Sequence, residues 1–161
     1  MPASPARAAA FKILLRVERE SAYAVELLHS GLLDGLLPED RNLATEIVMG
    51  VLRWRSLLDR SIAYFSFSPV PKLDLEVLTA LRMGAYQIKF LERIPAHAAV
   101  NETVELVKQS RKTSAAGLAN AVMRKILAQH RSGRPVIKTD GLAMSLAHPE
   151  WLVTKWGELF G

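Results

Sequence analysis

The 161-residue sequence contains no cysteine. This absence excludes disulfide bonds, thiolate catalysis and zinc sites built on thiolates, and it agrees with a reducing compartment. No apolar run reaches the roughly 18 residues that a membrane span needs, and the N-terminus has no apolar block followed by a cleavage site. The sequence therefore predicts a cytoplasmic protein that has neither a signal peptide nor a membrane partner.

Catalytic and cofactor-binding motifs are also missing. The sequence has no GxGxxG turn, no P-loop and no GxSxG elbow. Its four histidines lie too far apart in sequence for a metal-binding spacing. A nucleotide or methyl donor would normally need a glycine-rich turn after a strand, and no segment shows the alternation of a strand. We expect no catalytic residue, cofactor or metal in this chain, which favours a binding module.

Acidic residues are absent from positions 106–139, whereas eight of the 21 lysines and arginines lie there. All 16 acidic residues lie elsewhere, so the whole net charge of +5 comes from this segment. A basic segment of this kind attracts a phosphate backbone, and the alternative interpretation is a solvated surface. The same alternatives apply to the basic residues of the N-terminal segment. The candidate phosphate contacts are Arg7, Lys12, Arg16, Lys108, Arg111, Lys112, Arg124 and Lys125.

Apolar residues recur at helical spacing through almost the whole chain, which predicts an all-α fold. Prolines interrupt the pattern near positions 69–71 and 95. We expect one helical domain over 1–131, followed by a linker and the first helix of a further domain over 132–161. The expected helices of the first domain span 5–19, about 23–30, 40–65, 73–92, 98–111 and 114–130.

Four residues inside these helices are poor helix formers. A glycine costs about 1 kcal/mol relative to alanine within a helix, so Gly50 and Gly84 are expected at close helix crossings where a side chain would not fit. Asn101 and Asn120 are expected to be structural, because an asparagine in a helix needs an engaged amide. We expect these amides to bond a neighbouring helix or loop.

Other polar and aromatic residues lie beside the apolar stripes. Arg53 and Arg82 are expected to pair with carboxylates such as Asp59 or Glu46 rather than to contact a phosphate backbone. Aromatic rings can stack on bases. The helical spacing of Trp54 and Tyr86 with aliphatic residues nevertheless favours core packing.

The last 14 residues, "HPEWLVTKWGELFG", have the signals of a helix start, and the sequence stops there. Upstream, "DRNLATEIVMGVLRWRSLLDRSI", "LRMGAYQ", "IPAHAAVNE" and "NAVMRK" follow one another in an order that closely resembles the NusB-like domain. "VLRWRSLLD" and the C-terminal stretch are most similar to the branch found at the N-terminus of the bacterial small-subunit rRNA cytosine-C5 methyltransferases (the RsmB/Sun family). The chain is thus interpreted as the N-terminal part of a longer enzyme.

This resemblance implies two three-helix bundles packed roughly at right angles. It implies a non-catalytic RNA-binding domain that helps to position ribosomal RNA for a C-terminal methyltransferase domain in cis. S-adenosylmethionine would bind only in that C-terminal domain. The chain's Arg7 falls on an arginine of the family's N-terminal segment, but "MPASPA" stands where NusB has a run of arginines.

Two alternative functions stay open. The first is a free-standing NusB-type antitermination factor, which the C-terminal extension and the missing arginine run disfavour. The second is a protein-interaction module that docks on the catalytic domain or on a ribosomal protein. RNA binding and protein docking are separable, because RNA binding through phosphates weakens steeply with salt.

Overall fold

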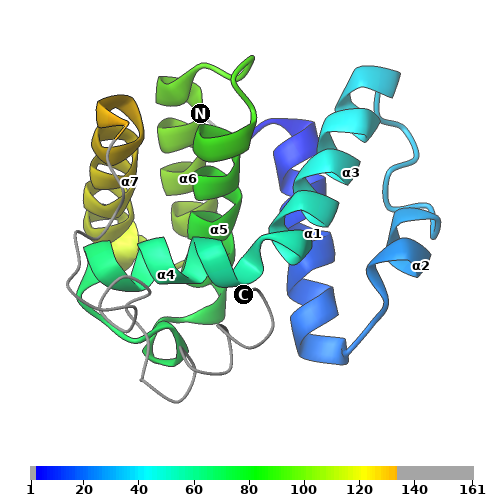
Figure 1. The fold of residues 1–161 in the computed structure, drawn as a ribbon. Helices are drawn as coiled ribbons and strands as arrows, with labels where there is room; N and C mark the ends of the chain where they lie inside the picture. Colours follow the sequence, from blue (N-terminus) through cyan, green and yellow to red (C-terminus); the bar gives the residue numbers. More distant parts are fainter. Residues whose placement is uncertain (1–2, 134–161) are drawn as a thin grey trace, which may run out of the picture.

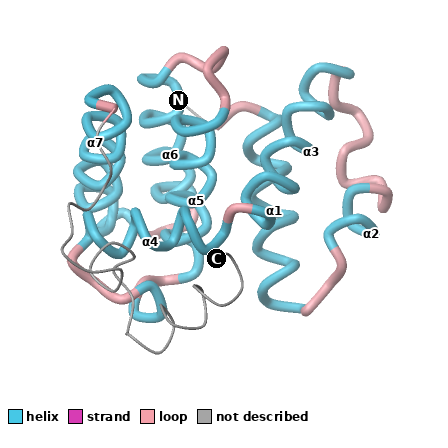
Figure 2. The backbone as a smooth tube through the Cα atoms, viewed as in Figure 1, coloured by secondary structure: helices cyan, strands magenta, loops and turns pink. Residues whose placement is uncertain are grey.

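The computed structural model describes residues 3–133, and all the regular structure within that range is helical (Figure 2). The predicted all-α fold is therefore confirmed, whereas the linker and helix expected in 132–161 lie outside the described residues from position 134 onward. No helix in the described range is both long and apolar enough to cross a membrane. The helices are α1 (Pro5–Glu20), α2 (Ala24–Leu28), α3 (Pro38–Arg53), α4 (Arg55–Ser66), α5 (Leu75–Phe90), α6 (Ala96–Gln109) and α7 (Ala116–Ser132), with 3₁₀ turns at Val70–Lys72 (η1) and Thr113–Ala115 (η2).

The helices form two groups around α5. Helices α1, α2 and α3 lie on one side of the molecule and α4, α6 and α7 on the other, in agreement with a two-bundle arrangement (Figure 1). Helix α5 packs against α1 and α3 as well as α4, α6 and α7. Its residues 77–88 are all buried, although its sequence predicted only an amphipathic stripe. The polar side chains of α5 therefore need partners inside the protein.

The prediction of a single helix over 40–65 is wrong, because α3 ends at Arg53 and α4 begins at Arg55. Trp54 between them has φ −103° and ψ 17°, outside the helical region. Helix α3 packs on α1 and α5, whereas α4 packs on α5 and α7, and one straight helix could not reach both sets of partners. Trp54 lies 38% exposed at the bend instead of in the core, its ring stacked on Phe90 at 5.0 Å. Tyr86 is buried as predicted.

Gly50 and Gly84 lie where helices cross closely. A Cβ atom at Gly50 on α3 would come within 3.0 Å of the Tyr86 ring on α5. A Cβ atom at Gly84 on α5 would come equally close to Thr103 on α6 and to Met123 on α7. Real Cβ atoms do not approach other atoms so closely, so each crossing requires a glycine at its centre.

Arg82 joins three helices through buried charge. Its Nε and Nη2 atoms donate to the two carboxylate oxygens of Asp59 on α4, at 2.7 and 2.9 Å, as the sequence predicted for this pair. Its Nη1 lies 3.7 Å from Glu18 on α1, which also pairs with Arg55 at 2.6 Å. The corresponding expectation for Arg53 is wrong.

Glu46 on α3 pairs with Arg93 instead of Arg53, at 2.5 Å. The guanidinium of Arg53 lies 5.6 Å from the centre of the Trp54 ring. The bend at Trp54 places that ring next to Arg53, and a cation–π contact of this kind satisfies an exposed guanidinium without a carboxylate.

Candidate nucleic-acid interface

Arg7, the first candidate phosphate contact, is buried and has partners inside the protein. Its Nε donates to Oε1 of Gln87 at 2.6 Å and its Nη1 pairs with Glu102 at 2.5 Å. Nη1 also donates to the Ser4 hydroxyl at 3.0 Å, so this N-terminal serine lies beside Arg7 and makes no side-chain cap. The interpretation of Arg7 as an RNA contact is therefore corrected: α1 packs against α5 and α6, and this packing encloses the guanidinium.

A groove of about 390 Å³ lies between α1 and α6, and we call it the α1–α6 groove. Three basic residues of α1 line it, and among the described residues no carboxylate does. Its apolar lining comes from Ala8, Phe11, Leu15 and Leu106, with Gln109 and Ser110 at the end of α6. The three basic residues, which follow one helical face, are Lys12, Arg16 and Arg19.

Two of these three cations have carboxylate partners. Arg16 pairs with Glu20 one turn later at 3.1 Å, and Arg19 pairs with Glu76 at the start of α5. Lys12 is exposed and forms no ion pair with any described residue. Lys12 is therefore the cation of this groove that is free to meet an external phosphate.

The end of α6 brings more basic residues to the same end of the molecule. Lys112 lies 3.7 Å from Asp74 and 3.9 Å from Glu76, so its charge is shared with α5. Lys108 and Arg111 are exposed and, within residues 3–133, form no ion pair. The structure thus leaves these three cations without an ion pair to any described residue: Lys12 in the α1–α6 groove, and Lys108 and Arg111 at the end of α6, about 100 positions later in the chain.

Arg111 has a left-handed backbone conformation, with φ 61°. Its N–H donates to the carbonyl of Lys108 at 3.0 Å and the N–H of Lys112 donates to that of Val107 at 3.2 Å. This pair of bonds is a Schellman ending, whose left-handed position usually carries glycine. An arginine there costs backbone energy, so its side chain is a candidate for a function outside the fold.

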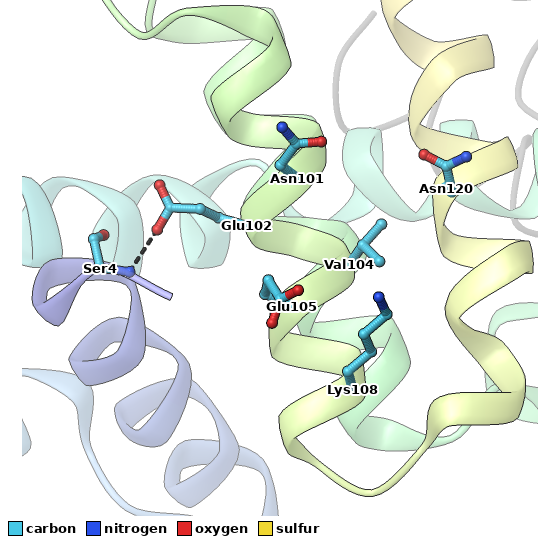
Figure 3. A pocket seen from close by; sticks show the side chains of 7 residues that line it. All are labelled: Ser4, Asn101, Glu102, Val104, Glu105, Lys108 and Asn120. Carbon is cyan, nitrogen blue, oxygen red and sulfur yellow. Dashed lines mark hydrogen bonds between the residues drawn. The ribbon is translucent and has the colours of Figure 1, made fainter. Parts of the chain in front are cut away.

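A larger groove of about 620 Å³ lies between the start of α1, α6 and α7, and we call it the α6–α7 groove. Figure 3 shows Asn101, Lys108 and Asn120 around it, together with Glu102, which accepts a bond from the Ser4 N–H at 2.6 Å. Lys108 is the cation in this lining, so each groove contains one cation without an ion pair to the described part of the chain, Lys12 in the α1–α6 groove and Lys108 here.

The expected bonds of Asn101 and Asn120 to a neighbouring helix or loop are not made. Asn101 is exposed and forms no hydrogen bond with any described residue. Asn120 accepts a bond from Nε of Arg124, one turn along its own helix, at 3.3 Å. Because both amides line a groove, water can solvate them, and they retain the capacity to bond a ligand.

Arg124 and Lys125 point to different surroundings. Arg124 is exposed and, through Asn120, lies next to the α6–α7 groove. The ammonium of Lys125 lies 5.0 Å from the centre of the Phe67 ring, which follows α4 and is 86% exposed. The structure therefore brings Arg124 toward the groove residues but places Lys125 beside the end of α4.

The comparisons with known proteins agree with this architecture. A model described as the NusB family matches residues 4–128. The chain belongs to the NusB family. The NusB of T. maritima has the same fold, with a TM-score of 0.70 and 22% identity over 81% of this chain and 94% of that one. A chain in the crystal structure of a plectonemic RNA supercoil matches with a TM-score of 0.73 and 21% identity, over 81% of this chain and 96% of that one.

Relatives of this NusB-family chain are longer proteins. The probable ribosomal RNA small subunit methyltransferase B of Bacillus subtilis is 34% identical over 167 residues, which cover 100% of this chain and 36% of that protein. The ribosomal RNA small subunit methyltransferase B of Thermus thermophilus is 38% identical over 163 residues, covering 100% and 37%. The chain thus spans little more than a third of the length of these relatives, and the resemblance to the N-terminal part of such proteins is confirmed.

Proposed function

We propose that this domain binds single-stranded ribosomal RNA without catalysing a reaction, and that it positions the RNA for a methyltransferase domain in the same protein. The observation that carries the proposal is that Lys12, Lys108 and Arg111 make no ion pair within residues 3–133. Lys12 lines the α1–α6 groove, and Lys108 lines the α6–α7 groove together with the unengaged amide of Asn101. Cations bind phosphates without regard to sequence, and amides can bond base edges. The expected cytoplasmic location is part of this proposal.

The methyltransferase activity and its cofactor belong to the proposal for the longer protein. S-adenosylmethionine does not fit the described residues, because residues 3–133 contain no strand followed by a glycine-rich turn. The same residues contain no group of three or more histidine and acidic side chains placed to hold a metal. The role left for this domain is to bind and orient the substrate.

Charge removal at the three free cations tests the proposal. For the variant with Lys12→Met, Lys108→Met and Arg111→Met, we expect at least about tenfold weaker binding to a single-stranded rRNA fragment. The slope of log K against log[salt] should fall by about 2, because each phosphate contact contributes about 0.7 on a single strand. Fluorescence anisotropy across a salt series measures both quantities.

Arg41→Met provides the matched control, since Arg41 is an exposed cation at the start of α3 and forms no ion pair with a described residue. The control should bind with unchanged affinity and slope. Equal losses in the control and the triple variant would show that only net charge matters, and no loss in the triple variant would refute the interface.

The strained arginine gives an independent prediction. Arg111→Gly should stabilise the fold by about 0.5–1 kcal/mol, because glycine adopts φ 61° without steric cost. The same substitution should weaken RNA binding. For this one variant, chemical denaturation should therefore show a higher stability and RNA titration a lower affinity. A loss of stability would instead show that the Arg111 side chain supports the fold.

A protein-docking function is the second candidate. Tyr23 and Val25 at the start of α2 are 74% and 55% exposed, and Leu37, which precedes α3, is 62% exposed. Exposed apolar side chains near one another, such as the first two, are typical of interaction surfaces. A pull-down with the methyltransferase domain or a ribosomal protein tests this candidate, whereas filter binding tests RNA. Antitermination is a weaker alternative, because the methyltransferase relatives match the whole chain.

A further inference from the structure

Arg60 on α4 and Lys89 on α5 are half-buried cations without an anion. The Nε atom of Arg60 is buried and has no hydrogen-bond partner. Within residues 3–133, neither side chain forms a hydrogen bond or an ion pair. The two more deeply buried arginines, Arg7 and Arg82, both have carboxylate partners. Arg60 and Lys89 therefore depart from the pattern by which this fold satisfies buried charge.

The positive charges of Arg60 and Lys89 repel each other. Burial lowers the pKa of the Arg60 guanidinium, and burial together with the charge of Arg60 lowers the pKa of the Lys89 ammonium. Holding two like charges in a partly desolvated place costs free energy. An anion bound between them would offset this cost, and the fork of a guanidinium together with a lysine ammonium suits the oxygens of a phosphate group.

An accessible aromatic residue follows Arg60 on α4. Tyr64 follows Arg60 by one helical turn on α4, so the two side chains share a flank of that helix. Tyr64 is 42% exposed, and its ring meets Phe65 edge to face, with 5.0 Å between the ring centres. A cation pair beside an exposed ring can bind both the phosphate and the base of a nucleotide. Trp54 cannot serve in this way as well, because Phe90 stacks on it and Arg53 lies over it.

This cation pair lies away from the two grooves. Helix α4 packs across α5 and α7 (Figure 1), whereas the grooves are lined mostly by residues of α1 and α6, and α7 contributes Asn120. The ring that makes the pair suitable for RNA, Tyr64, is likewise absent from the lining of both grooves. A ligand at Arg60 and Lys89 would therefore be additional to a ligand in the grooves.

We propose that Arg60 and Lys89 form a second phosphate site, which binds a backbone phosphate of single-stranded RNA while the adjacent base stacks on Tyr64. The inference rests on the proposed RNA-binding function and extends it to a second face of the domain. A longer single strand would then be held at two places. The alternative occupants of the site are a free phosphate ion and a carboxylate of a protein partner.

The test compares two charge-removal variants of the full 161-residue chain. With an oligouridylate of about 10 nucleotides, we expect Arg60→Met/Lys89→Met to bind about tenfold more weakly. The salt slope should fall by about 1.4, since two contacts are lost at about 0.7 each. Tyr64→Leu should weaken binding without changing the slope, whereas Tyr23→Leu, at a more exposed tyrosine, should leave binding unchanged.

Stability gives a readout that keeps the proposal falsifiable if the double variant does not fold. Lys89→Met alone should raise Tm by roughly 2–4 °C without RNA, because it removes a desolvated charge that Arg60 repels. Lys72→Met, at an exposed lysine of η1, should leave Tm unchanged. A lower Tm for Lys89→Met would mean that the charge of Lys89 stabilises the fold without a ligand, and would overturn the proposal.

The remaining outcomes separate the two interfaces. If the variant at Lys12, Lys108 and Arg111 loses affinity and the Arg60/Lys89 variant does not, the grooves bind RNA and the second site is refuted. If only the Arg60/Lys89 variant loses affinity, the groove proposal fails and the second site stands. Protection of Lys89 from acetylation by inorganic phosphate as strongly as by the oligouridylate would refute the nucleotide assignment.

Discussion

Replacing Arg82 by methionine is expected to lower the free energy of unfolding by about 3–5 kcal/mol. The substitution removes both bonds to Asp59 and leaves a partly buried carboxylate without its partner, while Glu18 loses a neighbouring positive charge. Domains of this size are stable by only about 5–15 kcal/mol, so this loss is a large fraction of the total. Urea denaturation followed by circular dichroism measures it.

A surface pair provides the comparison for this substitution. Arg16 and Glu20 are exposed and one turn apart, so Arg16→Met should change stability by less than about 0.5 kcal/mol. Adding Asp59→Asn to Arg82→Met should recover part of the loss, because the orphaned charge is then removed. If Arg82→Met and Arg16→Met have equal effects, the buried network does not hold α4 against α5.

Gly84→Ala should destabilise the domain by about 2–3 kcal/mol despite the better helix propensity of alanine. The added methyl group would come within 3.0 Å of the Thr103 hydroxyl and of the Met123 side chain, both buried. Met123 is flexible, but Thr103 is branched and its hydroxyl donates to the carbonyl of Ala99 at 2.8 Å, which fixes its position. The helices would have to separate, and thermal unfolding records the result.

Gly117→Ala is the matched control, because Gly117 is exposed in the first turn of α7 and a Cβ atom there would meet nothing within 4 Å. It should raise stability by up to about 1 kcal/mol. Shortening the opposing side chain in Gly84→Ala/Thr103→Ala should return part of the loss. Stabilisation by Gly84→Ala itself would contradict the close crossing.

Much of the helical architecture could be predicted from local pattern. Apolar spacing and proline breaks located α1, α5, α6 and α7 to within a few residues, because these signals act within one or two turns. The bend at Trp54 escaped prediction, since neither a proline nor a glycine marks it. The bend follows from where α5 and α7 lie in the folded protein, and no local sequence signal contains that information.

The candidate interface was only partly predictable for the same reason. Lys12, Lys108 and Arg111 were identified from charge, but charge alone could not separate them from Arg7, which is equally basic. Arg7 is buried because Gln87 and Glu102, 80 and 95 positions later, converge on it. Arg60 and Lys89 could not be singled out from the sequence, because what distinguishes them is that they are half-buried without an anionic partner among the described residues, and only the folded structure shows this.

The sequence by itself determined that this chain is helical, that it carries its excess positive charge in one segment, and that it belongs with NusB-like domains. Periodicity, composition and motif order contain these facts directly. Only the tertiary structure decided which cations are free. Whether a guanidinium has a carboxylate partner depends on contacts between residues far apart in the chain, and packing around α5 sets those contacts.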